Sequence, residues 1–167
     1  LHDFVFAQPP VDRTFYEMVP PGTPVKLYFD LELEGPSTVV EQMNQLQLAL
    51  THFVNYKLGE LYDRCVTPDD VVVLTSDGLK DNGQTKASRH LIWPVYFESV
   101  ADVKHFVHTV VVPQFAKGVD KGVYTNYRCF RLYENRKAGS RRVLKSGHAD
   151  GSTITRKRIF MQSLLTL

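Results

Sequence analysis

Three carboxylates occupy alternate positions in an otherwise apolar stretch, KLYFDLELE, at residues 26–34. Successive side chains of a β-strand point to opposite faces, so Asp30, Glu32 and Glu34 share one face while leucine and phenylalanine pack on the other. Their Cα atoms are about 6.6–7 Å apart, and their repulsion is relieved by water, by basic partners or by divalent metal ions. A half-solvated strand is the commoner explanation of such a pattern, so a metal site needs support from elsewhere in the chain.

Ser88 and His90 also stand two residues apart, in the strand-like stretch SRHLIW at 88–93. Serine hydrolases use these residue types, but alternate strand positions do not readily give the nucleophile–base hydrogen bond of about 2.6–3.2 Å, and no G-x-S-x-G turn occurs. The same spacing suits the binding of neighbouring phosphate oxygens, with Lys86 adding a positive charge. No Gly-rich phosphate loop is present, so phosphates need side-chain donors. An ordinary strand remains an alternative explanation of the tripeptide.

A third group follows in VDKGVYTNYRCFRLYENRK at 119–137, where Asp120 precedes Arg128, Arg131 and Lys137. One carboxylate and three cations can supply a metal ligand and the charges that neutralise a triphosphate. A solvated edge strand would carry the same residues.

Charge is distributed unevenly along the chain. Residues 1–120 hold 9 Lys and Arg against 16 Asp and Glu, a net charge of −7, whereas residues 121–167 hold 11 against 2, a net charge of +9. A basic third beside an acidic cluster suits a polyanion such as nucleic acid or a triphosphate, with metal ions between the like charges. A solvated, charged surface is equally consistent with these numbers.

Periodicity and turn residues predict the elements that position these groups. We expect strands at 15–19, 26–34, 71–74 and 88–93, the last stopped by Pro94, and a strand-like region at 123–133. We expect helices from Ser37 to about Asp63, from the Ser99/Asp102 capping box to the stop at Pro113, and over 159–167. Residues 77–84 read as a loop and 139–151 as a mobile basic stretch. The mixture predicts an α+β or α/β sandwich, with two small modules meeting at a cleft.

Composition narrows the class of protein. The chain has 167 residues, of which 43% are apolar, without the run of about 18 apolar residues that a membrane span requires. Two cysteines, Cys65 and Cys129, fit a reducing compartment and are too few for a four-cysteine zinc site. The first residue is Leu1 rather than Met, so we expect a fragment of a longer chain.

The order of these groups, with KLYFDLE, SRHLI and VDKGVYTNYRCFRLY as its motifs, resembles the archaeo-eukaryotic primase superfamily, specifically its eukaryotic primase-polymerase branch. The resemblance covers residues 15 to about 137. It implies that residues 1–167 form one α+β catalytic core, in which two small α/β modules, one of them RRM-like, surround a central cleft.

The resemblance also implies roles for individual residues. Asp30, Glu32 and Asp120 match the catalytic metal ligands of the family, and Ser88 and His90 match its triphosphate-binding S-x-H. Further nucleotide-binding residues would be Lys86, Arg131 and Lys137, with Tyr16 near the 2′ position of the incoming sugar. Nucleic-acid contacts are expected from Arg89 and Arg128, and Glu34 lies outside the motif as a solvated or supporting residue.

The implied activity is two-metal nucleotidyl transfer from a (d)NTP to a 3′-hydroxyl on a DNA template, in replication restart or translesion synthesis, with Mg²⁺ or Mn²⁺. DNA template-primer, nucleoside triphosphates and single-stranded-DNA-binding or replication proteins are the expected partners, without a membrane, in the nucleus or mitochondrion. A non-catalytic module that binds single-stranded nucleic acid is the alternative, and a rolling-circle endonuclease is a distant third because no His-x-His pair occurs.

Three departures from the family pattern affect these expectations. Residues 115–119 are less apolar than a strand that delivers Asp120 should be, so we expect that strand to be short or irregular. The interval from His90 to Asp120 is brief, consistent with a lost surface loop. The Cys/His cluster of the C-terminal zinc-binding domain is missing, so we expect no zinc and no de novo priming from this fragment.

Overall fold

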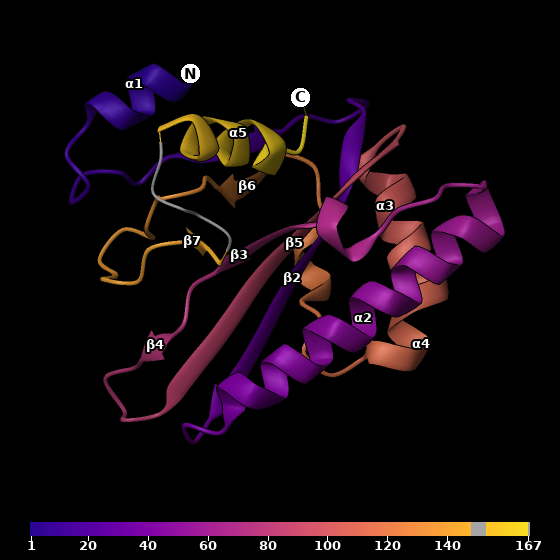
Figure 1. The fold of residues 1–167 in the computed structure, drawn as a ribbon, viewed down its shortest axis with the longest axis horizontal. Helices are drawn as coiled ribbons and strands as arrows, with labels where there is room; N and C mark the ends of the chain where they lie inside the picture. Colours follow the sequence, from indigo (N-terminus) through magenta and orange to yellow (C-terminus); the bar gives the residue numbers. More distant parts are fainter. Residues whose placement is uncertain (148–152, 167) are drawn as a thin grey trace.

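A computed structural model of the protein describes residues 1–147 and 153–166, and its fold is α+β, as the sequence predicts (Figure 1). Within these residues the strands form two antiparallel sheets. The smaller sheet pairs β1 (Tyr16–Val19) with β6 (Arg128–Arg131). The larger sheet has the order β2 (Val25–Gly35), β5 (Thr85–Phe97), β3 (Val72–Thr75) and β7 (Lys145–Ser146), with β4 (Gly78–Leu79) paired to β5.

Helices lie on both sides of the larger sheet. The long helix α2 (Val39–Tyr62) and α3 (Val100–Phe106) contact β2 and β5, whereas α5 (Thr153–Ser163) contacts β3 and the N-terminal helix α1 (His2–Ala7). Figure 1 shows α2 running alongside β2 and β5, away from α1 and α5. Among the helices described, none is both long and apolar enough to cross a membrane.

The face of β2 that carries the carboxylates is opposite to α2. Phe29 contacts Trp93 of β5 edge-to-face, with ring centroids 5.3 Å apart, and the Trp93 indole N–H donates to the Asn55 side chain of α2 at 2.6 Å. Helix α2 packs on the Phe29 and Trp93 side of the sheet with residues at helical spacing, including Met43, Leu50 and Val54, which are fully buried. Since side chains alternate along a strand, Asp30 and Glu32 point to the other face.

Strand β5 is longer than the sequence predicts, and the expected stop at Pro94 is wrong. The partner of Lys26 is Tyr96, but the partner of Tyr28 is Ile92, so β5 has extra residues between these two pairs and bulges there. Pro94 lies in this interval, where a ladder N–H is not required, and the strand continues to Phe97.

The predicted helix stop at Pro113 is also wrong. Ser99 caps α3 as expected, with its hydroxyl accepting from the Asp102 N–H at 3.4 Å. The helix then widens into a π-helical segment (Val107–Val111), and α4 (Val112–Phe115) follows with Pro113 in its first turn. A proline fits there because N–H groups in a first turn need no intrahelical acceptor.

Other boundaries differ from the prediction for local reasons. Ser37 does not begin α2, which has Thr38 at its N-cap position. Only Arg128–Arg131 of the predicted strand 123–133 is a strand, because Lys121–Val123 forms a 3₁₀ turn and Tyr127 has φ = 57°. Residues Pro68–Asp70 form a 3₁₀ segment, and the predicted loop 77–84 contains β4.

The C-terminal predictions are met in part. The closing helix spans Thr153–Ser163, so it begins and ends earlier than the predicted 159–167, and Leu167 lies outside the described residues. The basic stretch 139–151 includes β7, and its residues 148–151 also lie outside them.

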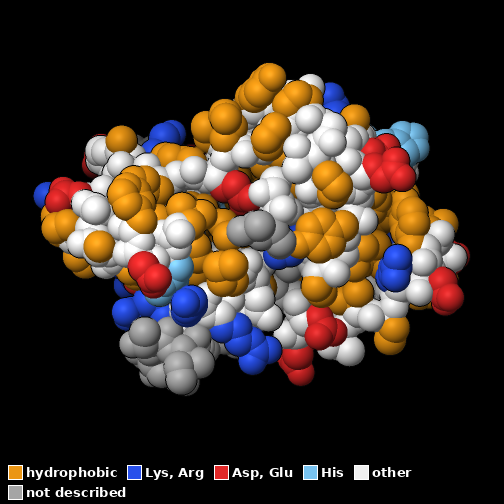
Figure 2. Space-filling view, turned by 90° about the horizontal axis from the view of Figure 1, so that it is seen from above, with side chains coloured by type: hydrophobic (Ala, Val, Ile, Leu, Met, Phe, Trp, Pro, Cys, Tyr) orange, Lys and Arg blue, Asp and Glu red, His pale blue; other side chains and the backbone are white. Residues whose placement is uncertain are grey.

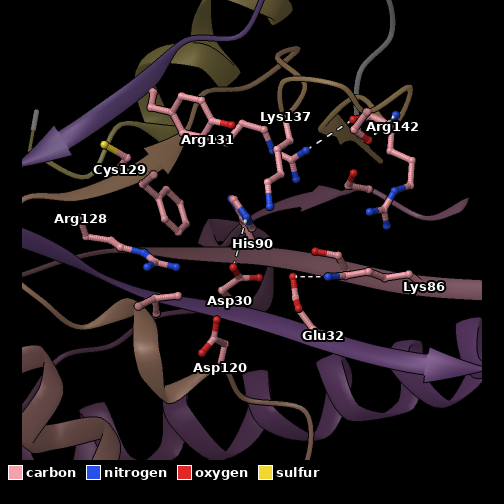
Figure 3. Close-up of a pocket in the computed structure, with 16 residues that line it drawn as sticks. Asp30, Glu32, Lys86, His90, Asp120, Arg128, Cys129, Arg131, Lys137 and Arg142 are labelled. Carbon is pink, nitrogen blue, oxygen red and sulfur yellow. Dashed lines mark hydrogen bonds and ion pairs between the residues drawn. The ribbon is translucent and has the colours of Figure 1, made fainter. Parts of the chain in front are cut away.

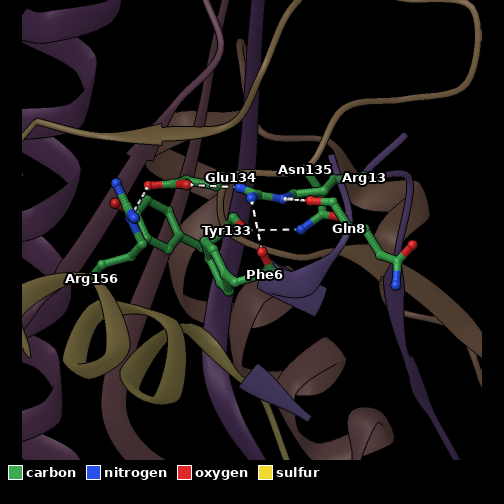
Figure 4. A network of polar contacts seen from close by, with 7 residues as sticks. All are labelled: Phe6, Gln8, Arg13, Tyr133, Glu134, Asn135 and Arg156. Carbon is green, nitrogen blue, oxygen red and sulfur yellow. Dashed lines mark hydrogen bonds and ion pairs between the residues drawn. The ribbon is translucent and has the colours of Figure 1, made fainter. Parts of the chain in front are cut away.

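A partly buried ionic cluster joins the N-terminal segment to α5 (Figure 4). Glu134 accepts from Arg13 at 3.2 Å with one carboxylate oxygen and from Arg156 at 2.9 Å with the other. Arg13 further donates to the backbone carbonyls of Gln8 at 3.0 Å and Phe6 at 3.2 Å. We call Arg13, Glu134 and Arg156 the Glu134 clamp, because the glutamate holds two cations from distant parts of the chain.

Candidate active site

The register of β2 against β5 sets the sequence motifs opposite one another. Asp30 pairs with His90, Glu32 with Ser88, and Glu34 with Lys86. Directly opposed residues of an antiparallel pair have side chains on the same face, with Cβ atoms about 4.5–5.5 Å apart. The D-x-E and K-x-S-x-H motifs therefore form one surface in which carboxylates face a lysine, a hydroxyl and an imidazole (Figure 3).

Asp120 reaches this surface through a single bridge rather than a strand. Val119 forms an isolated antiparallel bridge with Leu31, and the Asp120 N–H donates to the Asp30 carbonyl at 2.8 Å. The expectation of a short, irregular delivering segment is confirmed. Gly118 precedes the bridge with φ = 93°, a left-handed backbone conformation that favours glycine, and its Cα faces the Leu46 side chain of α2.

The smaller sheet supplies the opposite wall of the pocket. Tyr16 of β1 is the register partner of Arg131 in β6, and Phe130 packs on the His90 ring with centroids 4.2 Å apart. Figure 3 shows Arg131 and Lys137 reaching in from the side opposite Asp30 and Glu32.

A pocket of about 380 Å³ lies between the two sheets. It contains every residue predicted for catalysis, metal binding or nucleotide binding, together with Arg128. Its lining residues are Tyr16, Asp30, Glu32, Ser76, Lys86, Ser88, His90, Asp120, Val123, Arg128, Cys129, Phe130, Arg131, Lys137, Ser140 and Arg142.

Arg89, predicted to contact nucleic acid, lies outside this pocket. Its side chain is on the α2 face of β5, where it is 3% exposed, forms an ion pair with Asp77 and donates to Asn44 at 3.0 Å. The alternation that unites Ser88 and His90 places Arg89 on the other face. We do not include Arg89 in the proposed site.

Several lining residues were not identified from the sequence. Ser76 is a neighbour of β5, with its N–H donating to the Ser88 carbonyl at 3.0 Å. Arg142 comes from the basic stretch 139–151, where composition indicated positive charge but did not single out one arginine. Val123, Cys129, Phe130 and Ser140 are placed by tertiary packing, for which the sequence has no distinctive signal.

Asp30 is the most perturbed acid of the pocket. Burial, followed by the neighbouring carboxylates of Glu32 and Asp120, raises the pKa of Asp30 to about 7. One of its oxygens, Oδ1, is buried and has no hydrogen-bond partner among the residues that the structure describes. A buried acceptor that is left unpaired costs about 1–3 kcal/mol, so this atom is available to a ligand.

His90 is neutral in this environment. Burial, and then the charge of Arg131, lowers the pKa of His90 to about 3. Its Nε2 is 3.8 Å from Asp30 Oδ2, which is too long for a hydrogen bond, and a neutral ring makes no ion pair. Its buried Nδ1 has no partner within the described part of the chain, so the imidazole can still donate to or accept from a ligand.

Lys86 is already paired inside the pocket. Its Nζ lies 2.7 Å from Glu32 Oε1, and the lysine side chain is 17% exposed. Glu34, two residues further along β2, forms an ion pair with Lys80 at 2.7 Å and does not line the pocket.

The residues present fit divalent cations that bind together with a ligand. Across residues 1–147 and 153–166, no three His, Cys, Asp or Glu side chains form a ready-made cation site. Mg²⁺, however, is usually held by one or two carboxylates, several waters and substrate phosphates rather than by an all-protein cage. The unpaired Asp30 oxygen and the mutual repulsion of the three carboxylates suit such an arrangement.

Comparisons with known proteins show that the chain is similar to DNA-directed primase/polymerase proteins. No protein-family model matches the chain. It is similar to the DNA-directed primase/polymerase proteins of Gallus gallus, at 34% identity over 101 residues, and Homo sapiens, at 31% over 101 residues. Each of these alignments covers 59% of this chain and 17% of the relative.

The protein of the same name from Danio rerio is 27% identical over an alignment 206 positions long, which covers 90% of this chain and 38% of the relative. The resemblance to eukaryotic primase-polymerases is confirmed by these matches. The chain spans well under half of the length of these relatives.

Proposed function

We propose that this chain is the catalytic core of a DNA-directed DNA polymerase/primase, which transfers a nucleotidyl group from a (d)NTP to a 3′-hydroxyl on a DNA template. The observation that carries the proposal is the register of β2 against β5, which sets Asp30 and Glu32 against Ser88 and His90 in one pocket. Cations from β6 and the following loop face them. Similarity to proteins named DNA-directed primase/polymerase supports the same activity.

The triphosphate would lie between the two sheets. Lys86, Arg131 and Lys137 supply positive charge, and the guanidinium of Arg131 matches paired phosphate oxygens. Ser88 and neutral His90 add hydrogen bonds without adding charge.

Asp30, Glu32 and Asp120 would hold two Mg²⁺ or Mn²⁺ ions. When bound, such ions lower the pKa of the attacking hydroxyl and stabilise the charge that develops on pyrophosphate. The chain's own contribution is to fix Asp120 against β2 through its N–H and to keep Asp30 buried beside the reacting phosphate.

The family resemblance implies that Tyr16 would lie beside the incoming sugar, and Tyr16 lines the same pocket as its register partner Arg131. Arg128 lines the same pocket and would contact nucleic acid. In this proposal the two sheets are the two modules of an archaeo-eukaryotic primase core, one of them RRM-like, and the protein acts in replication restart or translesion synthesis with DNA, nucleotides and replication proteins as partners.

Primer extension on a templated oligonucleotide, with Mg²⁺ and with Mn²⁺, tests the proposal. We expect Asp30→Ala/Glu32→Ala to lose at least on the order of 10³-fold in rate, because the metal contribution is several kcal/mol. Glu34→Gln is the matched control, since Glu34 lies on the same strand face but outside the pocket, and it should keep the wild-type rate. Incorporation by the folded double variant at the wild-type rate would refute the proposal. DNA binding without incorporation by the wild type would favour the alternative, a non-catalytic module for single-stranded nucleic acid.

A further inference from the structure

A second groove opens beside the nucleotide pocket. Its walls are the turn between β4 and β5, at Leu79, Lys80, Asp81 and Asn82, and the loop Gly139, Ser140, Arg141 and Arg142. The groove has a volume of about 820 Å³, compared with about 380 Å³ for the nucleotide pocket. It is therefore too large for a single phosphate group and suits an extended ligand.

Both walls are held by their own hydrogen bonds. In the first turn, the Lys80 N–H donates to the Gln84 carbonyl at 2.8 Å and the Gly83 N–H to the Lys80 carbonyl at 2.9 Å. In the second, the Ser140 N–H donates to the Lys137 carbonyl at 2.9 Å, and the Arg142 N–H to the Ser140 hydroxyl at 3.2 Å. The groove therefore exists without a ligand.

The charge of the groove is mainly positive. Lys80, Arg141 and Arg142 line it, against the single carboxylate of Asp81. Lys80 is paired with Glu34, but neither Arg141 nor Arg142 has a carboxylate within ion-pair distance in the part of the chain that the structure describes. Figure 2 shows several Lys and Arg side chains close together near the lower edge of the face it presents, with others scattered over the rest of that face. Unpaired guanidinium groups are suited to phosphate oxygens.

The groove is continuous with the nucleotide pocket, because Ser140 and Arg142 line both. The stem of Arg142 lies over Gly78, where a Cβ would come within 2.9 Å of Arg142 Cδ. At the rim, Leu79 is 74% exposed and offers an apolar surface to a base. Proteins that bind single-stranded nucleic acid follow its backbone with a positively charged groove of this kind.

We infer that this groove binds the sugar-phosphate backbone of a single nucleic-acid strand that runs out of the nucleotide pocket. The inference rests on the proposed function for the identity of the neighbouring pocket. In this inference Arg141, which lines only the groove, contacts the nucleic-acid strand, and Arg142, which lines both cavities, lies between that strand and the nucleotide.

Charge reversal at one exposed arginine tests the inference, with binding of a fluorescent single-stranded oligo-dT followed by anisotropy. We expect Arg141→Glu to weaken binding on the order of tenfold and to reduce the salt slope of log K by about 0.7, because one phosphate is no longer neutralised. Lys157→Glu is the matched control, because Lys157 is equally exposed, on α5, and lines neither cavity. It should bind within about twofold of the wild type.

A charge-neutral variant tests the placement of Arg142. Gly78→Ala should push the arginine stem aside and weaken oligo-dT binding by about two- to threefold, with the net charge unchanged. Inorganic triphosphate, used as a competitor, separates a strand site from a phosphate site. We expect its affinity to be the same in Arg141→Glu as in the wild type.

Equal losses in Arg141→Glu and Lys157→Glu would overturn the inference, since only net charge would then matter. A parallel loss of inorganic triphosphate binding in Arg141→Glu would also overturn it, because the groove would be a phosphate site. These binding measurements need no catalysis. If the wild type fails to extend primers but Arg141→Glu binds oligo-dT more weakly than Lys157→Glu, the proposed function is refuted and the inference about the groove still holds.

Discussion

The Glu134 clamp and the pocket between the two sheets are two clusters of partly buried charge, and they are built in opposite ways. In the clamp, both oxygens of Glu134 accept hydrogen bonds from arginines, and Arg13 also donates to two backbone carbonyls. In the pocket, Asp30 has an unpaired oxygen, and its burial, followed by two carboxylate neighbours, raises its pKa. Satisfied charges hold distant parts of the chain together, whereas unsatisfied charges are available to a ligand.

The largest effect on stability should come from breaking the clamp at its centre. Glu134→Ala leaves Arg13 buried without a counter-charge, so we expect the free energy of unfolding to fall by about 3 kcal/mol. Urea unfolding measures this change. Glu134→Gln, which keeps one acceptor, should lose less. If Glu134→Ala unfolds at the wild-type urea concentration, the clamp is not a structural element.

In the pocket, removing a charge should stabilise the protein rather than destabilise it. The pKa of Asp30 is raised from 3.8 to about 7 in the folded protein, so the folded state binds this proton more tightly than the unfolded state does. The resulting stabilisation is complete below the unfolded pKa and is lost as the pH rises through about 7.

We therefore expect wild-type stability, measured by urea unfolding in EDTA, to fall by roughly 2 kcal/mol between about pH 5 and about pH 8 because of Asp30. Asp30→Asn should lack this component and be more stable than the wild type at the higher pH. If the stability of Asp30→Asn falls with pH as much as that of the wild type, the pKa of Asp30 is not raised in the folded protein.

Removing a counter-charge within the pocket should have a smaller effect. Lys86 Nζ forms an ion pair with Glu32 Oε1 at 2.7 Å, so a metal cation must compete with the lysine for that carboxylate. We expect Lys86→Met to tighten Mn²⁺ binding in the absence of nucleotide by about two- to fivefold, the range of a partly exposed ion pair, and to weaken dNTP binding. Titration calorimetry measures both. Lys80→Met, whose partner Glu34 lies outside the pocket, should bind Mn²⁺ as the wild type does.

The smallest effect is expected at the exposed arm of the clamp. Arg156 is 38% exposed, whereas the Arg13 side chain is 10% exposed. Because exposed ion pairs contribute little, Arg156→Ala should lower the free energy of unfolding by less than about 1 kcal/mol. A loss as large as that of Glu134→Ala would mean that the two arms are equivalent.

Strand alternation, helical spacing and a capping pair in the sequence predicted the elements whose formation depends on neighbouring residues. Alternation in KLYFDLELE indicated β2 and the common face of Asp30 and Glu32, and helical spacing indicated α2. The Ser99/Asp102 pair marked the start of α3. The same alternation, applied to Arg89, is sufficient to set that residue on the face opposite to Ser88 and His90, so its predicted contact with nucleic acid conflicted with the strand pattern itself.

Long-range packing determined what the sequence did not predict. Pro94 is tolerated because it lies in the bulge of β5, and Pro113 because it lies in the first turn of α4. The strand predicted at 123–133 is shortened because Tyr124 is buried against Tyr28, to whose carbonyl its hydroxyl donates at 3.1 Å, rather than paired in a sheet. Arg142 enters the pocket only because its loop folds over Gly78.

The most direct test of the central claim, that the pocket's unsatisfied charge serves a nucleotide and divalent ions, is the affinity for a dNTP with and without Mn²⁺, measured by calorimetry. We predict that Mn²⁺ strengthens dNTP binding to the wild type by about tenfold or more. This gain should be absent in Asp30→Asn, although that variant is folded. Equal affinity with and without Mn²⁺, or the same gain in Asp30→Asn, would contradict the account.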